Sequence, residues 1–421
     1  MNEISNINII AAIIFAIALI HTFAAKSFEK LAHKSTKHSG LLHLLGEIEV
    51  VFGLWAFVLI GVMALTVGGQ EALEYAETRH YTEPLFVFVI MVIAASKPVL
   101  ETVKGLVTVL AKAIPIRTAV ARVWLCMFMV PLIGSLITEP AAMTLAALML
   151  APLVFREGMP EWKKYAALGV LFVNISIGGT LTSFAAPPVL MVAATWGWDS
   201  AFMAANFGWK AAIAVFINAT VLTFLIRSHL SESDSASGNN PQEVPMPPIV
   251  ALVHLLALAG VVLFAHHPVI FLAIFLFFLG FTKAYAPYQN PLVLKEALLV
   301  GFFLAGLVVL GGMQQWWLQP IVSGLQPTAL FFGALGLTAI TDNAALTYLG
   351  SLIEGMSDQA KYMLMAGAVA GGGLTVIANA PNPAGVALLR AGFRHGAIGI
   401  GGLLAGAILP TIVAAAMFLM L

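Results

Sequence analysis

The sequence predicts an all-α polytopic membrane protein built from two inverted repeats. Hydrophobic residues make up 60% of its 421 residues, and only 10% are charged. A soluble chain of this length would need more charged residues to cover its surface. Apolar segments near the length of roughly 20 residues that spans a bilayer recur along the whole chain. Their order is similar in the two halves, which predicts the repeats.

The apolar segments form two sets separated by a polar stretch. We expect a first repeat over 1–228, a cytoplasmic linker over 229–247 and a second repeat over 248–421, with about ten transmembrane helices in total. The linker is rich in Ser, Asn and Pro, a composition typical of flexible connections. The segments that predict spans or breaks are 6–25, 41–67, 85–111, 119–155, 165–195 and 208–227, followed by 248–265, 268–284, 291–312, 327–356, 361–390 and 397–420.

Two of these segments contain polar residues in the middle of an apolar run. The run over 120–155 contains Thr138-Glu139-Pro140, and the run over 327–356 contains Thr341-Asp342-Asn343. A helix tends to end where proline or a charge lies at mid-depth. We therefore predict two re-entrant helical hairpins with these residues at their tips.

Glycine and proline interrupt one further segment in each half. Gly178-Gly179-Thr180-Leu181-Thr182 is similar to Gly371-Gly372-Gly373-Leu374-Thr375, and proline pairs follow both runs. The segments 165–195 and 361–390 are therefore predicted to be broken helices. Free backbone carbonyls and half-helix ends in such breaks suit a small cation.

The distribution of basic residues supports this layout. If both hairpins return to the side from which they enter, one face receives most of the 20 lysines and arginines. The positive-inside rule assigns that face to the cytoplasm. The two halves then have opposite orientation in the membrane.

Carboxyl groups at the hairpin tips are the strongest candidates for function. A charged side chain at the bilayer centre costs about 2.5–3.5 kcal/mol on insertion scales, so such residues usually have a role. We expect Glu139 and Asp342 to bind sodium and protons, with capping of a helix as the alternative. Thr138, Thr341 and Asn343 could supply further oxygen ligands or could equally cap helices.

Polar residues of the predicted breaks are candidates for lining the same site, with turn formation as the alternative. They are Gly179, Thr180, Thr182, Gly372, Thr375, Asn379 and Asn382.

A separate charged group lies in the predicted span over 85–111. Lys97, Glu101 and Lys104 share one helix face and can neutralise one another. We expect a structural pair, with a secondary role in proton access as the alternative.

Several classes of protein are not indicated. The formal net charge is zero, so no basic surface predicts nucleic-acid binding. There is no Walker loop, nucleophile elbow or HExxH motif, and we expect neither an enzyme nor a cofactor, only transported sodium and protons. An intramembrane aspartyl protease is a remote alternative, because its Tyr-Asp and Gly-x-Gly-Asp motifs are absent.

The motif Ile-Gly-Gly-Thr-x-Thr (177–182), followed by Pro187-Pro188, resembles the broken helix of the ion transporter superfamily. This group includes arsenite permeases, divalent-anion/sodium symporters and sodium/proton antiporters, and the sequence is most similar to a sodium/proton antiporter family. The resemblance implies a bacterial inner-membrane protein with a homodimerisation scaffold and a moving transport domain in the lipid bilayer.

The sequence also departs from the symporter branch of this superfamily. Dicarboxylate symporters have Ser-Asn-Thr at their hairpin tips, where this chain has Glu139 and Asp342. Ala186 and Val189 replace the glycine and asparagine expected around the proline pair. Two carboxylates would repel an anionic substrate, so we expect exchange of cytoplasmic sodium for protons. Sodium-coupled transport of a small anion or oxyanion, of the dicarboxylate or arsenite type, is the alternative.

Overall fold

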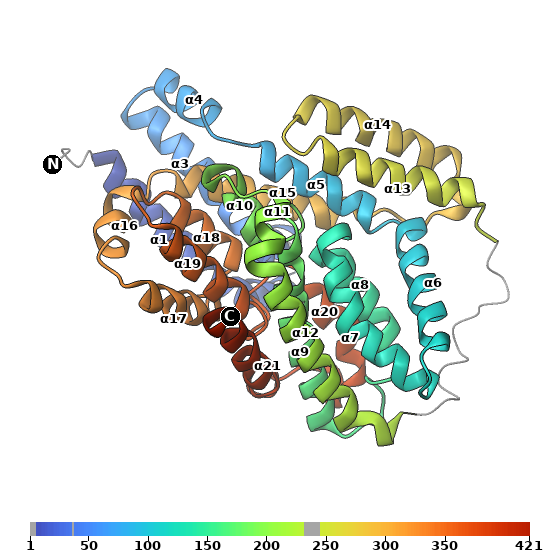
Figure 1. Ribbon diagram of the computed structural model, residues 1–421. Coiled ribbons are helices and arrows are strands. Elements are labelled where there is room, and N and C mark those ends of the chain that lie inside the picture. Colours follow the sequence, from blue (N-terminus) through green and yellow to red (C-terminus); the bar gives the residue numbers. More distant parts are fainter. Residues whose placement is uncertain (1–5, 36–37, 231–244) are drawn as a thin grey trace. The chain divides into compact units, whose positions relative to one another are not determined.

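The computed structural model describes residues 6–35, 38–230 and 245–421. Within these ranges the chain forms helices and turns and no β-strand (Figure 1). The all-α prediction is confirmed. Most of the linker predicted at 229–247 lies outside the described residues.

Seven helical segments of the described chain are long and apolar enough to cross a membrane, or eight if one bent pair counts as a span. The molecule is thus a multi-pass membrane protein, whereas the total of about ten spans stays a prediction. The seven segments are Asn6–Ala25, Ile48–Thr66, Thr118–Ile137, Glu161–Leu181, Ser200–His229, Leu294–Gly311 and Ile400–Met420.

The predicted span over 85–111 is the bent pair and is not a single straight helix. Helix α5 (Thr82–Ala94) and helix α6 (Lys97–Ala113) meet at an angle of 61°. Pro98 lies in the first turn of α6. Proline has no amide hydrogen to continue a helix but is favoured at a helix start, which accounts for the break.

Contacts between Cα atoms divide the chain into two compact units, which are described in turn. Unit 1 comprises 1–88, 294–325 and 348–356, and unit 2 comprises 89–293, 326–347 and 357–421.

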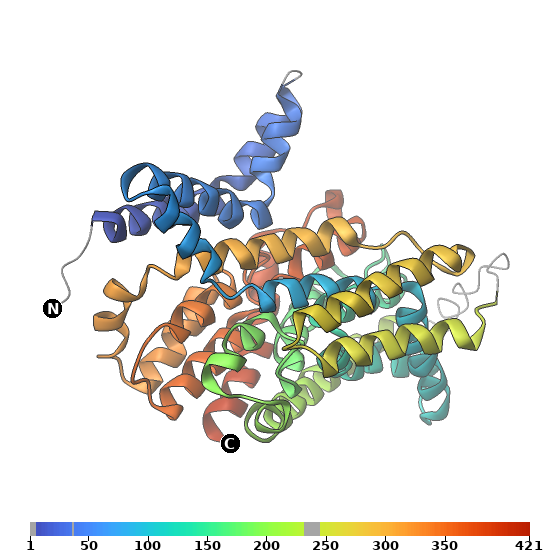
Figure 2. The same cartoon turned by 90° about the horizontal axis from the view of Figure 1, so that it is seen from above.

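Unit 1 is a packed group of helices around α3 and α15. The backbones of these two helices approach closely, since a Cβ atom at Gly306 would overlap the backbone of Gly53. Phe52 packs edge-on against Phe15 and Phe303, with ring centroids 5.9 and 5.1 Å apart. Its helices, coloured blue and gold in Figure 2, are α1 (Asn6–Lys34), α2 (Ser39–Gly46), α3 (Ile48–Thr66), α4 (Gly69–Glu77), α15 (Leu294–Gly311) and α16 (Gln315–Val322).

Unit 2 is organised around α9 (Glu161–Gly178), which is buried along most of its length. Its buried residues include polar ones, such as Asn174 and Ser176, whose side chains donate hydrogen bonds to carbonyls of neighbouring helices. The other helices are the end of α5, all of α6, α7 (Thr118–Ile137), α8 (Glu139–Leu150), α10 (Pro187–Trp196), α11 (Ser200–Met203), α12 (Trp209–Ile226), α13 (Pro248–Leu263), α14 (Pro268–Ala284), α17 (Pro327–Thr338), α18 (Asn343–Ser351, which continues into unit 1), α19 (Asp358–Gly371), α20 (Asn382–Leu389) and α21 (Ile400–Met420).

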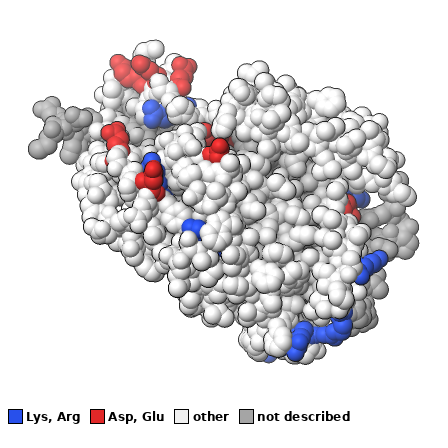
Figure 3. All heavy atoms as spheres, in the orientation of Figure 1, with Lys and Arg blue, Asp and Glu red and all other residues white. Residues whose placement is uncertain are grey.

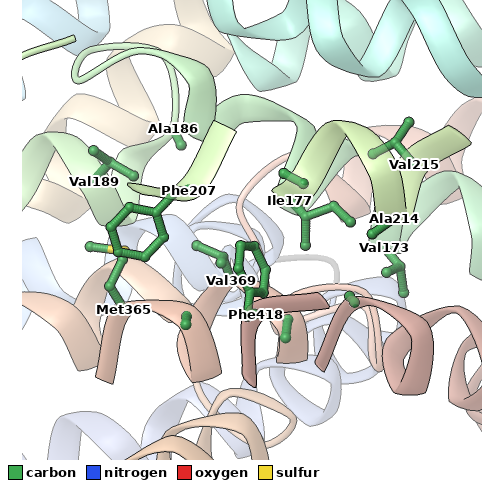
Figure 4. Close-up of a cluster of buried hydrophobic side chains, with 14 of the residues drawn as sticks. Val173, Ile177, Ala186, Val189, Phe207, Ala214, Val215, Met365, Val369 and Phe418 are labelled. Carbon is green, nitrogen blue, oxygen red and sulfur yellow. The ribbon is translucent and has the colours of Figure 1, made fainter. Parts of the chain in front are cut away.

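A cluster of buried hydrophobic side chains joins α9, α10, α12, α17, α19 and α21 (Figure 4). Phe207 stacks on Tyr362 of α19, with ring centroids 4.7 Å apart, and lies edge-on to Phe418 of α21. Val189 of α10 and Val369 of α19 belong to the same cluster. The chain segments on both sides of the linker therefore share one core in unit 2.

Candidate ion-binding site

The chain reverses direction between α7 and α8. A Cβ atom at Gly134 would lie 3.1 Å from the Cβ of Ala142, whereas residues eight apart in a continuous helix are separated by about 12 Å. The turn residue Thr138 has φ 85°, a conformation that β-branched residues rarely adopt. Pro140 follows in the first turn of α8, where a missing amide hydrogen is tolerated. Thr138 and Glu139 are thus at the tip of two packed helices.

Glu139 is fully buried at this tip, with 0% of its surface exposed. Its Oε2 accepts a hydrogen bond of 2.8 Å from the side-chain amide of Asn379. Its Oε1 is buried and has no hydrogen-bond partner. A Cβ atom at Gly179 would overlap Oε1, so the carboxyl group fits only because that position is glycine.

The second tip differs from the first. Asp342 is partly exposed, and its Oδ1 accepts hydrogen bonds from the backbone amides of Ala344 and Ala345, at 2.8 and 3.2 Å. One oxygen of Asp342 therefore caps the start of α18, the alternative considered for this residue. The carboxyl groups of Asp342 and Glu139 lie close enough to interact electrostatically.

The two Gly/Pro-rich segments are interrupted next to these tips. Helix α9 ends at Gly178 and α10 begins at Pro187, while α19 ends at Gly371 and α20 begins at Asn382. The side-chain amide of Asn382 donates to the carbonyls of Gly372 and Thr375, at 2.8 and 2.9 Å. These bonds fix the backbone of the second break.

Hydrogen bonds attach each break to the hairpin of its own half. The hydroxyl of Thr182 donates to the Ser135 carbonyl at 2.6 Å, and that of Thr375 donates to the Ala339 carbonyl at 2.8 Å. Both threonines had been predicted to line the site, and their hydroxyl hydrogens are used within the protein.

Other contacts cross between the halves. The backbone amide of Asn343 donates to the Ala378 carbonyl at 3.1 Å. The hydroxyl of Thr347 donates to the Pro188 carbonyl at 2.9 Å. With the bond from Asn379 to Glu139, these contacts bring both tips and both breaks together inside unit 2.

Several buried polar atoms at this junction have no hydrogen-bond partner. A buried polar atom without a partner is costly, so a cluster of them suggests a ligand. Asn343 and Asn382 are neighbours, because both contact Gly372. The atoms are Thr138 Oγ1, Glu139 Oε1, Asn343 Oδ1 and Nδ2, Asn379 Oδ1 and Asn382 Oδ1. All but one are oxygens, and one belongs to a carboxyl group, which is the donor set that a hard cation prefers.

Some of the predicted residues do not contribute free side-chain atoms to this junction. The hydroxyls of Thr180 and Thr341 donate to carbonyls of the preceding turn, Ile177 and Leu337. On α6, Lys104 pairs with Glu101 at 3.0 Å, and both side chains are 38% exposed. Such an exposed pair contributes at most about 1 kcal/mol.

Lys97 is the first residue of α6. A role of Lys97, Glu101 and Lys104 in proton access stays a prediction.

Ser135 was missed by the sequence reasoning. Its hydroxyl donates to the Gly178 carbonyl at 2.7 Å and accepts from the Leu181 amide at 3.0 Å. It therefore fixes the first break against α7. The sequence contained a signal for this role. A hydroxyl residue lies three positions before the tip threonine in both halves, as Ser135 before Thr138 and as Thr338 before Thr341.

A known protein family matches nearly the whole chain. The family model described as "Putative Na+/H+ antiporter" matches residues 6–421. No curated protein matches the chain.

Proposed function

This chain belongs to the Na+/H+ antiporter family, and from its site we propose that it exchanges cytoplasmic sodium for protons by alternating access, with Glu139 as the group for which the two ions compete. The observation that carries the proposal is the buried Oε1 of Glu139, which has no hydrogen-bond partner, on a residue bonded to Asn379, whose Oδ1 is also buried and unpartnered. The ion transport role follows from the family. The exchange, its direction and its residues are the proposal.

Competition at one carboxyl group would couple the two ions. Burial away from water favours the neutral, protonated carboxyl group, whereas a bound sodium ion favours the ionised one. The amide of Asn379 also favours the ionised form, because it donates to Oε2. In the sodium-bound state, Thr138, Asn343, Asn379 and Asn382 would supply neutral oxygens. In the proton-bound state, the neutral Glu139 would need only one of them, as the acceptor for its O–H hydrogen.

Asp342 has a different task in this proposal. Its Oδ1 caps α18 and thereby fixes the second tip, beside which Asn343 lies. Its negative charge is felt at Glu139, so it raises the attraction of the site for any cation. Sodium would thus be held by Glu139 with electrostatic help from Asp342.

The membrane arrangement is also part of the proposal. We take the tips as re-entrant hairpins of two inverted repeats, over 1–228 and 248–421, in the inner membrane of a bacterium. Support comes from the reversal at Thr138 and from the contacts that cross between the halves. A homodimer in the lipid bilayer, and a carrier without enzymatic activity, complete the proposal.

Sodium-coupled transport of a small anion is the second candidate. It would require donors facing the ligand, and Asn343 Nδ2 is the one unpartnered amide donor among the described side chains of the site. The two nearby carboxyl groups disfavour binding of an anion, because their ionised forms would repel it. This alternative is included in the test because of that donor.

The test is a pH-gradient assay on the purified full chain in proteoliposomes. Sodium, lithium and potassium chlorides are added in turn, and then dicarboxylate and arsenite. We expect sodium to dissipate the gradient without any added anion, and protein-free liposomes to show no response. A response that requires an anion would replace exchange by symport.

A further inference from the structure

A groove of about 590 Å³ lies in unit 2 between the start of α7 and the end of α12. Its walls are apolar, formed by Ile116, Val120, Trp124 and Phe224 among others, and two arginines, Arg117 and Arg227, lie at its edge. Ile116 and Phe224 remain 50% and 64% exposed. The groove is separate from the ion site, with which it shares no residue.

The two arginines are held in defined positions. The guanidinium of Arg227 lies over the ring of Phe224, with its Cζ 3.9 Å from the ring centroid. The guanidinium of Arg117 donates to the backbone carbonyls of Arg227 and Leu230. Arg117 thus compensates the carbonyl end of α12, and Arg227 is left as an exposed cation beside the apolar wall.

A third polar group lines the groove. Thr223 is only 5% exposed, and its hydroxyl is buried without a hydrogen-bond partner. A buried hydroxyl of this kind would gain a hydrogen bond from an acceptor such as an ester or phosphate oxygen. The groove therefore combines an apolar wall, a cation and an unsatisfied donor.

From this combination we propose that the groove binds one anionic phospholipid, with the phosphate at Arg227 and an acyl chain along Val120 and Phe224. Basic pockets between transmembrane helices on the cytoplasmic side are suited to anionic lipid headgroups. The loop before α7 and the segment after α12 are both on the face that the basic residues assign to the cytoplasm. On the face drawn in Figure 3, lysine and arginine side chains are visible near the end of α12.

A phospholipid fits this groove better than a soluble anion does. The apolar side chains that form the wall would remain exposed beside a bound inorganic phosphate, but an acyl chain would cover them. The proposal does not depend on which ion the protein transports, because none of the groove residues belongs to the ion site.

The test is native mass spectrometry of the full chain in mild detergent, titrated with phosphatidylglycerol or phosphatidylcholine. We expect one phosphatidylglycerol to be retained in preference to phosphatidylcholine. Arg227→Ala should weaken phosphatidylglycerol binding about fivefold, which corresponds to about 1 kcal/mol for one basic residue near an anionic surface. Arg390→Ala removes a charge from the same predicted face outside the groove and should leave binding unchanged.

A second variant tests the apolar part without altering charge. Val120→Trp would fill the groove and should reduce phosphatidylglycerol binding, while a size-exclusion profile matching wild type shows that the variant is folded. Equal losses in Arg227→Ala and Arg390→Ala would overturn the proposal. So would retention of both lipids alike, or displacement of the bound lipid by inorganic phosphate.

Discussion

Substitution of Asn379 by alanine tests how the site favours sodium over the proton. The amide of Asn379 donates a hydrogen bond of 2.8 Å to Glu139 Oε2, and Glu139 Oε1 has no partner. In Asn379→Ala, neither carboxyl oxygen would have a protein donor. The ionised carboxyl group loses most from this change, because a hydrogen bond to a charged group contributes about 1.5–3 kcal/mol.

Sodium binds only the ionised carboxyl group, so the loss appears in sodium binding. The half-saturating sodium concentration at a fixed pH should rise by about 10- to 150-fold. Because protons compete for the same group, raising the pH should restore much of the lost exchange. A merely structural defect would instead lower the maximal rate at every pH.

The assay measures sodium-dependent collapse of a pH gradient in proteoliposomes, over a series of sodium concentrations at several pH values. Asn206→Ala is the matched control, because its side-chain amide donates to the Phe202 carbonyl within its own helical turn. The reasoning is refuted if Asn379→Ala and Asn206→Ala have the same sodium dependence at each pH.

Three further substitutions test other parts of the site. Gly179→Ala should abolish exchange and lower the free energy of unfolding by about 1–3 kcal/mol, because the added methyl group overpacks against Glu139. Gly336→Ala is the control, because Gly336 has open space around it, and it should change neither property. Transport assays and thermal unfolding measure both variants. Asp342→Asn should preserve the α18 cap but weaken sodium binding. Asp342→Ala should weaken sodium binding and also lower the free energy of unfolding by about 0.5–2 kcal/mol. Equal stability of the two variants would argue against the cap. Thr182→Val should lower the free energy of unfolding by about 0.5–1.5 kcal/mol, because the hydroxyl loses its hydrogen bond to the Ser135 carbonyl. The half-saturating sodium concentration should not change. A rise in that concentration would show that the hydroxyl is a sodium ligand.

Local chemistry made the helix breaks predictable from the sequence. Pro140 after Glu139, and the Gly and Pro runs after Gly178 and Gly371, interrupt helices for reasons that depend only on neighbouring residues. The structure has helix ends at these places. The same reasoning could have found the bend before Pro98, because Ser96 and Lys97 precede this proline as polar residues also precede Pro140.

Long-range packing explains what the sequence could not predict. Glu139 and Asp342 occupy matching positions in the two halves, yet one is fully buried and the other caps a helix at a partly exposed site. Glu139 also has a hydrogen bond from Asn379, which is 240 residues away from it in the chain. No local pattern indicates that this asparagine faces Glu139, whereas Ala186 occupies the matching place in the first half.

The most direct test of the central claim is sodium-dependent proton flux in proteoliposomes that contain Glu139→Gln. Glutamine keeps the size of the side chain, and its amide can donate to the unpartnered Asn379 Oδ1, so the variant should fold as wild type does. It cannot alternate between a charged and a neutral state, and it therefore should carry no sodium-dependent proton flux at any pH. Wild-type flux in folded Glu139→Gln would contradict the account.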